Sequence, residues 1–160
     1  MKIIKNFLQP EIFKQMQELV FSHDFPYFYV PTVGSVTDKS DFMFQHMLFF
    51  DNKQNSPHYN LLVSPLLGKL DFNFLIRAKL NCYTKKQKFI YTDLHTDFGE
   101  PHSVALFSLN TCNGFTYFED TKEKIPSIEN QMCIFDGKRR HCSVSQTDTD
   151  LRVNININLQ

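Results

Sequence analysis

The sequence predicts an α+β protein of one domain, in which helices come first and a barrel or sandwich of short β-strands follows. Near the start, Ile12, Met16 and Leu19 recur at helical spacing, and Pro10 suits the first turn of a helix. Further along, the sequence changes to short apolar runs bounded by turn residues, which is typical of strands. Residues 152–158 alternate strictly between polar and apolar, so this strand must have one polar and one apolar face. A chain of 160 residues can bury one sizeable core.

The first part of the chain contains the expected helices. We expect residues 1–22 to form a helix, ended by Pro26, which cannot continue the hydrogen-bond ladder and constrains the residue before it. Residues 31–41 have the composition of a loop, and by analogy with loops that close over active sites they are a candidate lid. The apolar residues 42–50 could form a strand or a buried segment. Residues 55–70 could form a second helix with a broad apolar face.

The second half is expected to be mainly strands. Asn-Gly at 113–114 and Asp-Gly at 136–137 mark turns between apolar runs. The runs that fit strands are residues 74–83, 103–109, 115–118, 131–135, 141–144 and 151–159.

Charge and composition exclude several classes of protein. The 17 basic and 17 acidic side chains give a formal net charge of zero, which argues against nucleic-acid binding through general attraction to phosphates. No run of 18 apolar residues is present, which argues against a membrane partner, and the start lacks the apolar stretch of a signal peptide. We therefore expect a cytoplasmic protein. The 4 cysteines show no Cys-x-x-Cys spacing and are expected to be reduced, buried thiols.

Three residues of the strand-rich half are candidate metal ligands. His95 and Asp97 are two residues apart, so on an extended chain their side chains leave the same face. His141 begins a later strand. Two imidazoles and one carboxylate can occupy one face of a metal ion and leave other positions open, as in non-haem Fe(II) oxygenases. His-x-Asp alone is weak evidence, because ordinary loops often contain such pairs.

Arg152 strengthens the metal hypothesis. It comes 11 residues after His141 and begins the polar face of the last strand. If that face lines the interior of a barrel, the guanidinium requires an anion, and its planar fork suits a carboxylate. The alternative is an outward-facing arginine paired with Asp148 or Asp150.

These residues, in this order, resemble the Fe(II)/2-oxoglutarate-dependent oxygenases, and most closely the prolyl-4-hydroxylase-like branch. Further matches are Asn-Cys-Tyr at 81–83, the turn region at 109–118, and the Asn-x-x-x-x-Phe-Asp pattern at 130–136 that leads to the distal histidine. The resemblance covers residues 74–158. It implies a double-stranded β-helix, a jelly-roll or cupin-like barrel, with N-terminal helices packed against it. Residues 1–160 would then be one dioxygenase domain, with 1–73 as helical support and possible lid and 74–160 as the β-helix core.

The resemblance also implies roles for individual residues. His95, Asp97 and His141 would hold Fe(II), and Arg152 would bind the distal carboxylate of the cosubstrate 2-oxoglutarate. Tyr83 matches a tyrosine that often hydrogen-bonds the cosubstrate. Asn154 stands where several relatives carry Ser, and its amide can donate to the same carboxylate. With O2, the implied reaction hydroxylates a C–H bond and forms succinate and CO2.

The substrate is not readable from these residues. A prolyl residue in a peptide is favoured by the resemblance, and a free amino acid or another small metabolite is the alternative. A nucleobase is disfavoured, because the chain lacks a stripe of aromatic and basic residues. A non-catalytic jelly-roll binding module and a zinc hydrolase also remain open. His102 follows Pro101 in the loop after the metal pair and is expected to be solvated.

Overall fold

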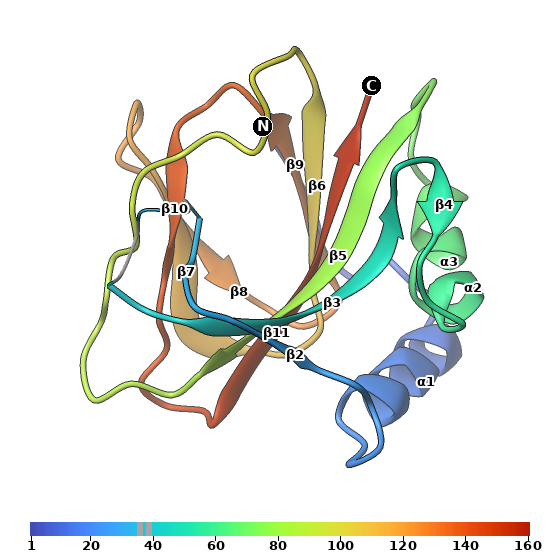
Figure 1. Ribbon diagram of the computed structural model, residues 1–160, viewed down its shortest axis with the longest axis horizontal. Coiled ribbons are helices and arrows are strands. Elements are labelled where there is room, and N and C mark those ends of the chain that lie inside the picture. Colours follow the sequence, from blue (N-terminus) through green and yellow to red (C-terminus); the bar gives the residue numbers. More distant parts are fainter. Residues whose placement is uncertain (35–36, 38–39) are drawn as a thin grey trace.

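The computed structural model describes residues 1–34, 37 and 40–160, and its strands form two antiparallel sheets that face each other across a barrel (Figure 1). The main sheet has the strand order β1-β9-β6-β11-β5-β3-β2, with β4 paired to β3, and the smaller sheet has the order β10-β7-β8. The strands are β1 (Lys2–Ile4), β2 (Phe28–Val30), β3 (Met43–Phe50), β4 (Lys53–Gln54), β5 (Leu75–Thr84), β6 (Ser103–Ser108), β7 (Cys112–Phe118), β8 (Lys124–Ser127), β9 (Gln131–Asp136), β10 (His141–Val144) and β11 (Leu151–Leu159). The helices are α1 (Pro10–Val20), α2 (Tyr59–Leu62) and α3 (Ser64–Leu67).

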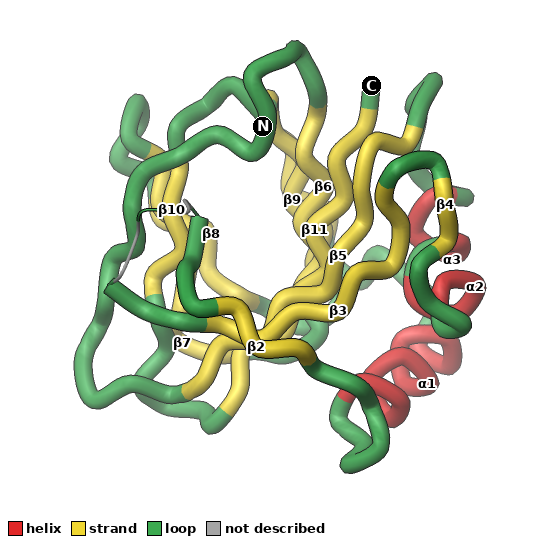
Figure 2. The backbone as a smooth tube through the Cα atoms, in the orientation of Figure 1, coloured by secondary structure: helices red, strands yellow, loops and turns green. Residues whose placement is uncertain are grey.

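The helices lie on the outer side of the main sheet, as the backbone tube shows (Figure 2). In α1 the buried residues Phe13, Met16 and Val20 recur at helical spacing and form the face turned to the sheet. The ring of Phe13 meets that of Phe107 on β6 edge-on, with centroids 5.9 Å apart. These residues belong to one hydrophobic cluster that also includes Ile155 of β11. The larger core therefore lies between the helices and the sheet, outside the barrel.

Strand β11 separates this core from the barrel interior. Its odd-numbered residues Val153, Ile155 and Ile157 are fully buried in the hydrophobic cluster. Its even-numbered residues are polar and point to the other face, because successive side chains of a strand alternate. In the antiparallel pairing with β5, Arg152 lies opposite Tyr83 and Asn156 lies opposite Lys79. The strict alternation in the sequence thus produces an apolar outer face and a polar inner face.

The first part of the chain is less helical than expected. Of the apolar residues 42–50, Met43–Phe50 form strand β3 of the main sheet, so the sheet does not begin near residue 74. The expected helix over residues 55–70 is instead two four-residue helices, α2 and α3. Pro65, near the start of α3, has no N–H to donate and interrupts the helical ladder. Residues 2–4, expected to be part of a helix, pair with β9 as a strand.

Two further expectations can be compared with the structure. All four cysteines are buried and reduced, as predicted. Across the part of the chain that the structure describes, no helix is both long and apolar enough to cross a membrane.

The ring of Phe107 is the centre of the helix–sheet core, and its loss should destabilise the protein. Phe107 is fully buried and contacts the rings of Phe7 and Phe13. We expect Phe107→Ala to lower the free energy of unfolding by about 3–5 kcal/mol, because it leaves a cavity between α1 and the sheet. Urea denaturation measures this loss. As the matched control, Phe28→Ala removes a ring that is 60% exposed and should change stability by less than about 0.5 kcal/mol.

Candidate metal centre

Backbone pairing brings the two candidate histidine ligands together. His95 lies in the segment between β5 and β6, and His141 begins β10. The amide of each donates to the carbonyl of the other at 3.0 Å, forming an isolated antiparallel bridge. The two imidazole rings consequently lie side by side, with centroids 4.8 Å apart. Two segments 46 residues apart in sequence thus present their imidazoles to the same space.

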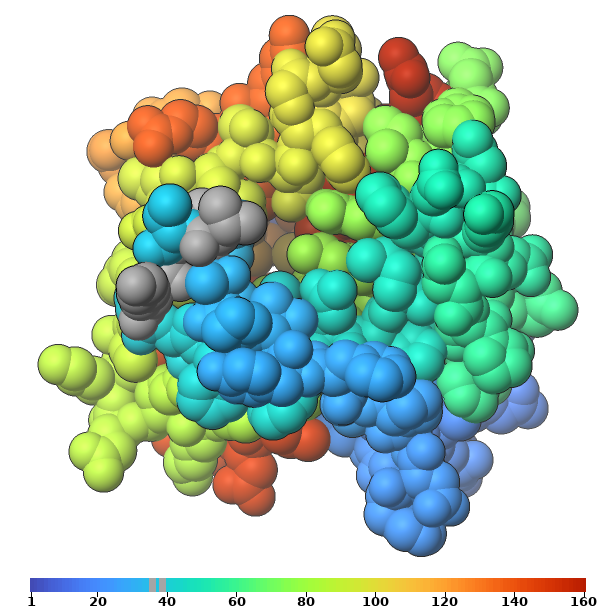
Figure 3. All heavy atoms as spheres, in the orientation of Figure 1, coloured from blue at the N-terminus to red at the C-terminus, as the bar shows by residue number. Residues whose placement is uncertain are grey.

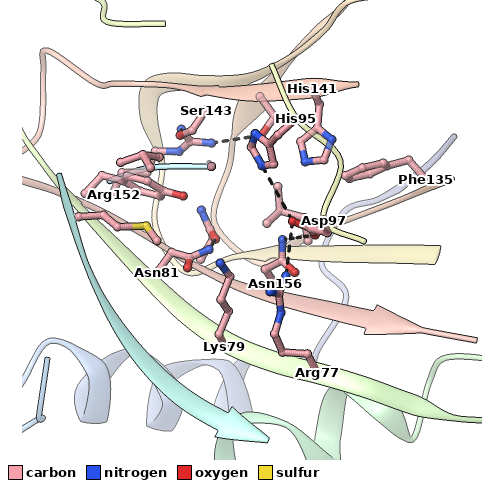
Figure 4. Close-up of a pocket in the computed structure, with 17 residues that line it drawn as sticks. Arg77, Lys79, Asn81, His95, Asp97, Phe135, His141, Ser143, Arg152 and Asn156 are labelled. Atoms are coloured by element: carbon pink, nitrogen blue, oxygen red, sulfur yellow. Dashed lines mark hydrogen bonds and ion pairs between the residues drawn. The ribbon is translucent and has the colours of Figure 1, made fainter. Parts of the chain in front are cut away.

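The donor atoms of His95, Asp97 and His141 converge on one point inside the barrel. One ligand atom from each residue lies within 4.8 Å of the other two. His95 Nε2 is 3.9 Å from Asp97 Oδ1. The close-up shows the carboxylate below the two imidazoles, facing the same space (Figure 4). This spacing suits three ligands on one face of a single ion, with the other face open.

The hydrogen bonds of both imidazoles leave Nε2 free to bind a metal. His95 Nδ1 donates to the Asp93 carbonyl at 2.9 Å, and His141 Nδ1 donates to the Arg139 carbonyl at 2.9 Å. A carbonyl only accepts, so Nδ1 carries a proton in both rings, and in a neutral imidazole the lone pair is then on Nε2. Burial lowers the pKa of His141, and neighbouring His95 lowers it further, which favours the neutral form that a metal requires.

Asp97 is held ionised by residues of β11 and β5. The side-chain amides of Asn156 and Asn158 donate to its Oδ2 at 3.1 and 2.8 Å. Arg77 Nη2 lies 3.4 Å from Oδ1. Burial by itself would raise the pKa of Asp97, but Arg77, the Asn158 amide and Lys79 together keep it well below its usual range. Partners of this kind fix the orientation of a metal-binding carboxylate.

Arg152 is a buried cation whose hydrogen bonds go only to neutral groups. Its side chain points into the barrel and the residue is 2% exposed, so the outward-facing alternative is wrong. Nη1 donates to Ser143 Oγ at 3.0 Å and to the carbonyls of Val144 and Phe115 at 3.0 and 3.2 Å. Within residues 1–34, 37 and 40–160, no carboxylate pairs with it, and its buried Nε has no hydrogen-bond acceptor. A guanidinium in this position is costly unless a ligand supplies the anion.

Tyr83 and Asn154 line the same pocket as Arg152 and the histidines. The guanidinium carbon of Arg152 is 5.4 Å from the centre of the Tyr83 ring. Asn154 accepts a hydrogen bond at 3.1 Å from the side chain of Asn81. The structure therefore places all six predicted site residues, His95, Asp97, His141, Arg152, Tyr83 and Asn154, around one pocket. Their roles remain predictions.

Several lining residues were missed by the sequence analysis. Arg77 and Lys79 share the inner face of β5 with Tyr83, and Asn156 shares that of β11 with Arg152. The period-2 alternation counted back from Tyr83 would have identified both cations. Gly34 lies so close to His95 that a Cβ on it would be 2.5 Å from Nδ1. Of the candidate lid at residues 31–41, residues 35, 36, 38 and 39 lie outside the described residues.

The expectation that His102 is solvated is wrong. His102 is 6% exposed, and its Nδ1 donates to the Glu100 carbonyl at 2.8 Å. Its ring occupies the place that a side chain at residue 137 would take, because a Cβ on Gly137 would lie 2.1 Å from Nε2. The amide of Gly137 in turn donates to the His102 carbonyl. Packing against a glycine explains the burial of this loop histidine.

The pocket opens to the surface near the centre of the space-filling view. There the surface is hollowed between the yellow segment before β6 and the blue segment that follows α1 (Figure 3). Gly34 and His95 are among the residues that line the pocket. A small molecule can therefore approach the histidines from outside.

Comparisons with known proteins identify the fold. No protein-family model matches the chain, and no curated protein matches it in sequence. A solved 2-oxoglutarate-Fe(II) oxygenase-family oxidoreductase from Burkholderia pseudomallei is similar over 98% of this chain and 83% of its own, with a TM-score of 0.72 and 13% identity. A prolyl hydroxylase from Trichoplax adhaerens, in complex with a peptide fragment, is similar over 99% and 82%, with a TM-score of 0.63 and 17% identity.

A third similar structure is that of an enzyme with a different reaction. The α-ketoglutarate-dependent epimerase SnoN from nogalamycin biosynthesis matches over 99% of this chain and 76% of its own, with a TM-score of 0.67 and 14% identity. The neighbours are thus 2-oxoglutarate-Fe(II) oxygenase-family proteins that include prolyl hydroxylases. The resemblance found in the sequence is confirmed at the level of the fold, a mostly antiparallel jelly-roll type with few helices. Sequence identities this low show only that the fold is shared.

Removal of one candidate ligand should remove metal binding. We expect His95→Ala or Asp97→Ala to weaken Fe(II) binding by more than about 100-fold, because an open site with two protein ligands does not hold the ion. Anaerobic titration calorimetry measures the affinity. As the matched control, His23→Ala removes an imidazole that is 92% exposed and should leave the affinity unchanged. An unchanged Fe(II) titration for His95→Ala or Asp97→Ala would refute the assignment of the site.

Proposed function

We propose that this protein is an Fe(II)- and 2-oxoglutarate-dependent dioxygenase that hydroxylates a C–H bond of its substrate. The observation that carries the proposal is the guanidinium of Arg152, buried without a counter-ion in the pocket of the His-Asp-His group. A metal group alone would suit several chemistries. A metal group together with a buried site for a carboxylate suits a cosubstrate that binds the ion at one end and carries an acid at the other.

The residues of the pocket fit these ligands. His95, Asp97 and His141 would hold Fe(II), and Arg152 would bind the distal carboxylate of 2-oxoglutarate through a bidentate pair. Tyr83 and Asn154 would contact the cosubstrate between these ends. Iron and 2-oxoglutarate would supply the chemistry, which is activation of O2 coupled to oxidative decarboxylation to succinate and CO2.

The protein would contribute orientation and a shielded site. The carbonyls of Asp93 and Arg139 fix the tautomers of the ligand imidazoles, and Asn156 and Asn158 keep the Asp97 carboxylate in place. Phe135 packs edge-on against the ring of His141 at 5.0 Å, which excludes water from that side of the ligand. Pre-set ligands of this kind need no reorganisation when substrate binds.

For the substrate we propose a prolyl residue in a peptide or, as the alternative, a free amino acid or another small metabolite. The fold neighbours include a prolyl hydroxylase bound to a peptide and an epimerase, so the fold does not decide between them. We also propose that residues 1–160 act as one domain and that the protein works in the cytoplasm. Four buried, reduced cysteines support this compartment.

Loss of the Arg152 guanidinium should separate cosubstrate binding from metal binding. We expect Arg152→Met to bind Fe(II) as the wild type does, but to bind 2-oxoglutarate about 30-fold or more weakly, a loss of about 2–5 kcal/mol. Anaerobic calorimetry on the metal-loaded protein measures both affinities. Arg140→Met, which removes an exposed arginine paired with Glu119, is the matched control and should leave both unchanged.

A turnover assay accompanies this measurement. The wild type should convert 2-oxoglutarate to succinate slowly even without its substrate, and Arg152→Met should not. Equal 2-oxoglutarate affinity in the two proteins would show that Arg152 is structural. Binding of 2-oxoglutarate without any succinate formation would favour a non-catalytic binding module.

A further inference from the structure

A second cation, Lys79, points into the pocket and forms no ion pair with any residue that the structure describes. Lys79 lies on the inner face of β5, opposite Asn156 of β11. Figure 4 shows its side chain rising towards the middle of the pocket, between Asn81 and Asn156. Throughout the described ranges, no hydrogen bond or ion pair of its ammonium group is found. Its neighbours Asn81 and Asn156 are neutral, and Asp97, which attracts the ammonium group, is already paired with Arg77.

The other charges of the pocket are already engaged. Arg77 forms an ion pair with Asp97, and the two asparagine amides of β11 share the same carboxylate. Burial lowers the pKa of Lys79 to about 8, with repulsion from Arg77 adding to the effect and attraction to Asp97 opposing it. Lys79 therefore stays predominantly charged at neutral pH, and none of the carboxylates that the structure describes forms an ion pair with it.

The charge balance of the pocket leaves room for a further anion. Of the described residues that line it, three are cations, Arg77, Lys79 and Arg152, and Asp97 is the one carboxylate. Under the proposed function, the two positive charges of Fe(II) and the two negative charges of 2-oxoglutarate cancel each other. A filled pocket would still carry excess positive charge, which disfavours a neutral occupant and favours an acid.

We propose that Lys79 binds a carboxylate other than the one held by Arg152. This inference rests on the proposed function, and it narrows the chemistry of the occupant. The carboxylate belongs either to an acidic primary substrate, such as a free amino acid, or to the metal-binding end of 2-oxoglutarate itself. An internal prolyl residue of a peptide carries no carboxylate and leaves Lys79 unpaired.

The first arm of the test measures 2-oxoglutarate. The protein is loaded with Mn(II), which accepts the same nitrogen and oxygen ligands, and titrated with 2-oxoglutarate by calorimetry. Lys79→Met is compared with Lys79→Arg, which keeps the charge, and with Lys124→Met, which removes an exposed lysine of β8. If the carboxylate is that of 2-oxoglutarate, Lys79→Met binds it at least about tenfold more weakly and Lys79→Arg restores most of the affinity.

The second arm measures a separate acid. Acetate, the smallest stable carboxylate probe, is added to the protein loaded with Mn(II) and 2-oxoglutarate, and acetamide serves as its neutral isostere. Acetate bound at Lys79 lies near the paramagnetic ion, so its methyl proton resonance broadens. If the carboxylate is that of the substrate, the broadening is lost in Lys79→Met, is retained in Lys79→Arg and Lys124→Met, and is absent with acetamide.

Each outcome decides a different point. If Lys79→Met weakens only the binding of 2-oxoglutarate, Lys79 is assigned to the cosubstrate. If Lys79→Met abolishes only the broadening of the acetate resonance, Lys79 is assigned to an acidic substrate. If Lys79→Met changes neither the 2-oxoglutarate affinity nor the acetate broadening, while Arg152→Met still weakens 2-oxoglutarate binding, this proposal is overturned and the proposed function stands. If the wild type does not bind 2-oxoglutarate at all, the proposed function itself fails. Thermal melting of Lys79→Met confirms that the variant is folded.

Discussion

The antiparallel pairing of β11 with β5 is the constraint on which the rest of the structure depends. Its register places Arg152 opposite Tyr83, Asn156 opposite Lys79 and Asn158 opposite Arg77. Because the side-chain period of a strand is two, a slip by one residue would move every one of these polar groups to the helix side of the sheet. The apolar residues between them are held by the core under α1. That core therefore fixes the chemistry of the opposite face.

The pocket contains buried charges that the protein treats in two different ways. Asp97 is surrounded by Arg77 and two amides, so the folded protein itself satisfies it. Arg152 and Lys79 form no ion pair with any described residue, although Arg152 is almost wholly buried. Uncompensated buried cations lower stability, and a fold that keeps them must recover the cost elsewhere. A bound acid does this, so the same side chains that weaken the empty pocket select its ligands.

Much of the barrel could be predicted from the sequence, because its strands carry strong side-chain patterns. Strand β11 alternates without exception, and His95, Asp97, His141 and Arg152 follow in a spacing that resembles a known family. The short strands β1, β2 and β4 gave no such signal, since they are held mainly by backbone pairing with a neighbouring strand. Their positions depend on partners distant in sequence.

The errors in predicting individual residues also have specific physical causes. His102 is buried because Gly137 leaves room for its ring, a contact between residues 35 positions apart. Lys79 was overlooked because a lysine between apolar residues also fits the solvated side of a strand. Only the pairing of β5 with β11 shows that this side faces the pocket. The sequence therefore indicated the type of chemistry, whereas the distribution of charge in the pocket required the three-dimensional structure.

The most direct test of the central claim is an anaerobic visible spectrum. Fe(II) is added to the protein, followed by 2-oxoglutarate, with metal binding verified by titration. If the His-Asp-His group and Arg152 act together as described, a weak charge-transfer band in the green region appears only when Fe(II) and 2-oxoglutarate are both present, because the cosubstrate then chelates the iron. Bound iron without such a band at saturating 2-oxoglutarate would contradict the account.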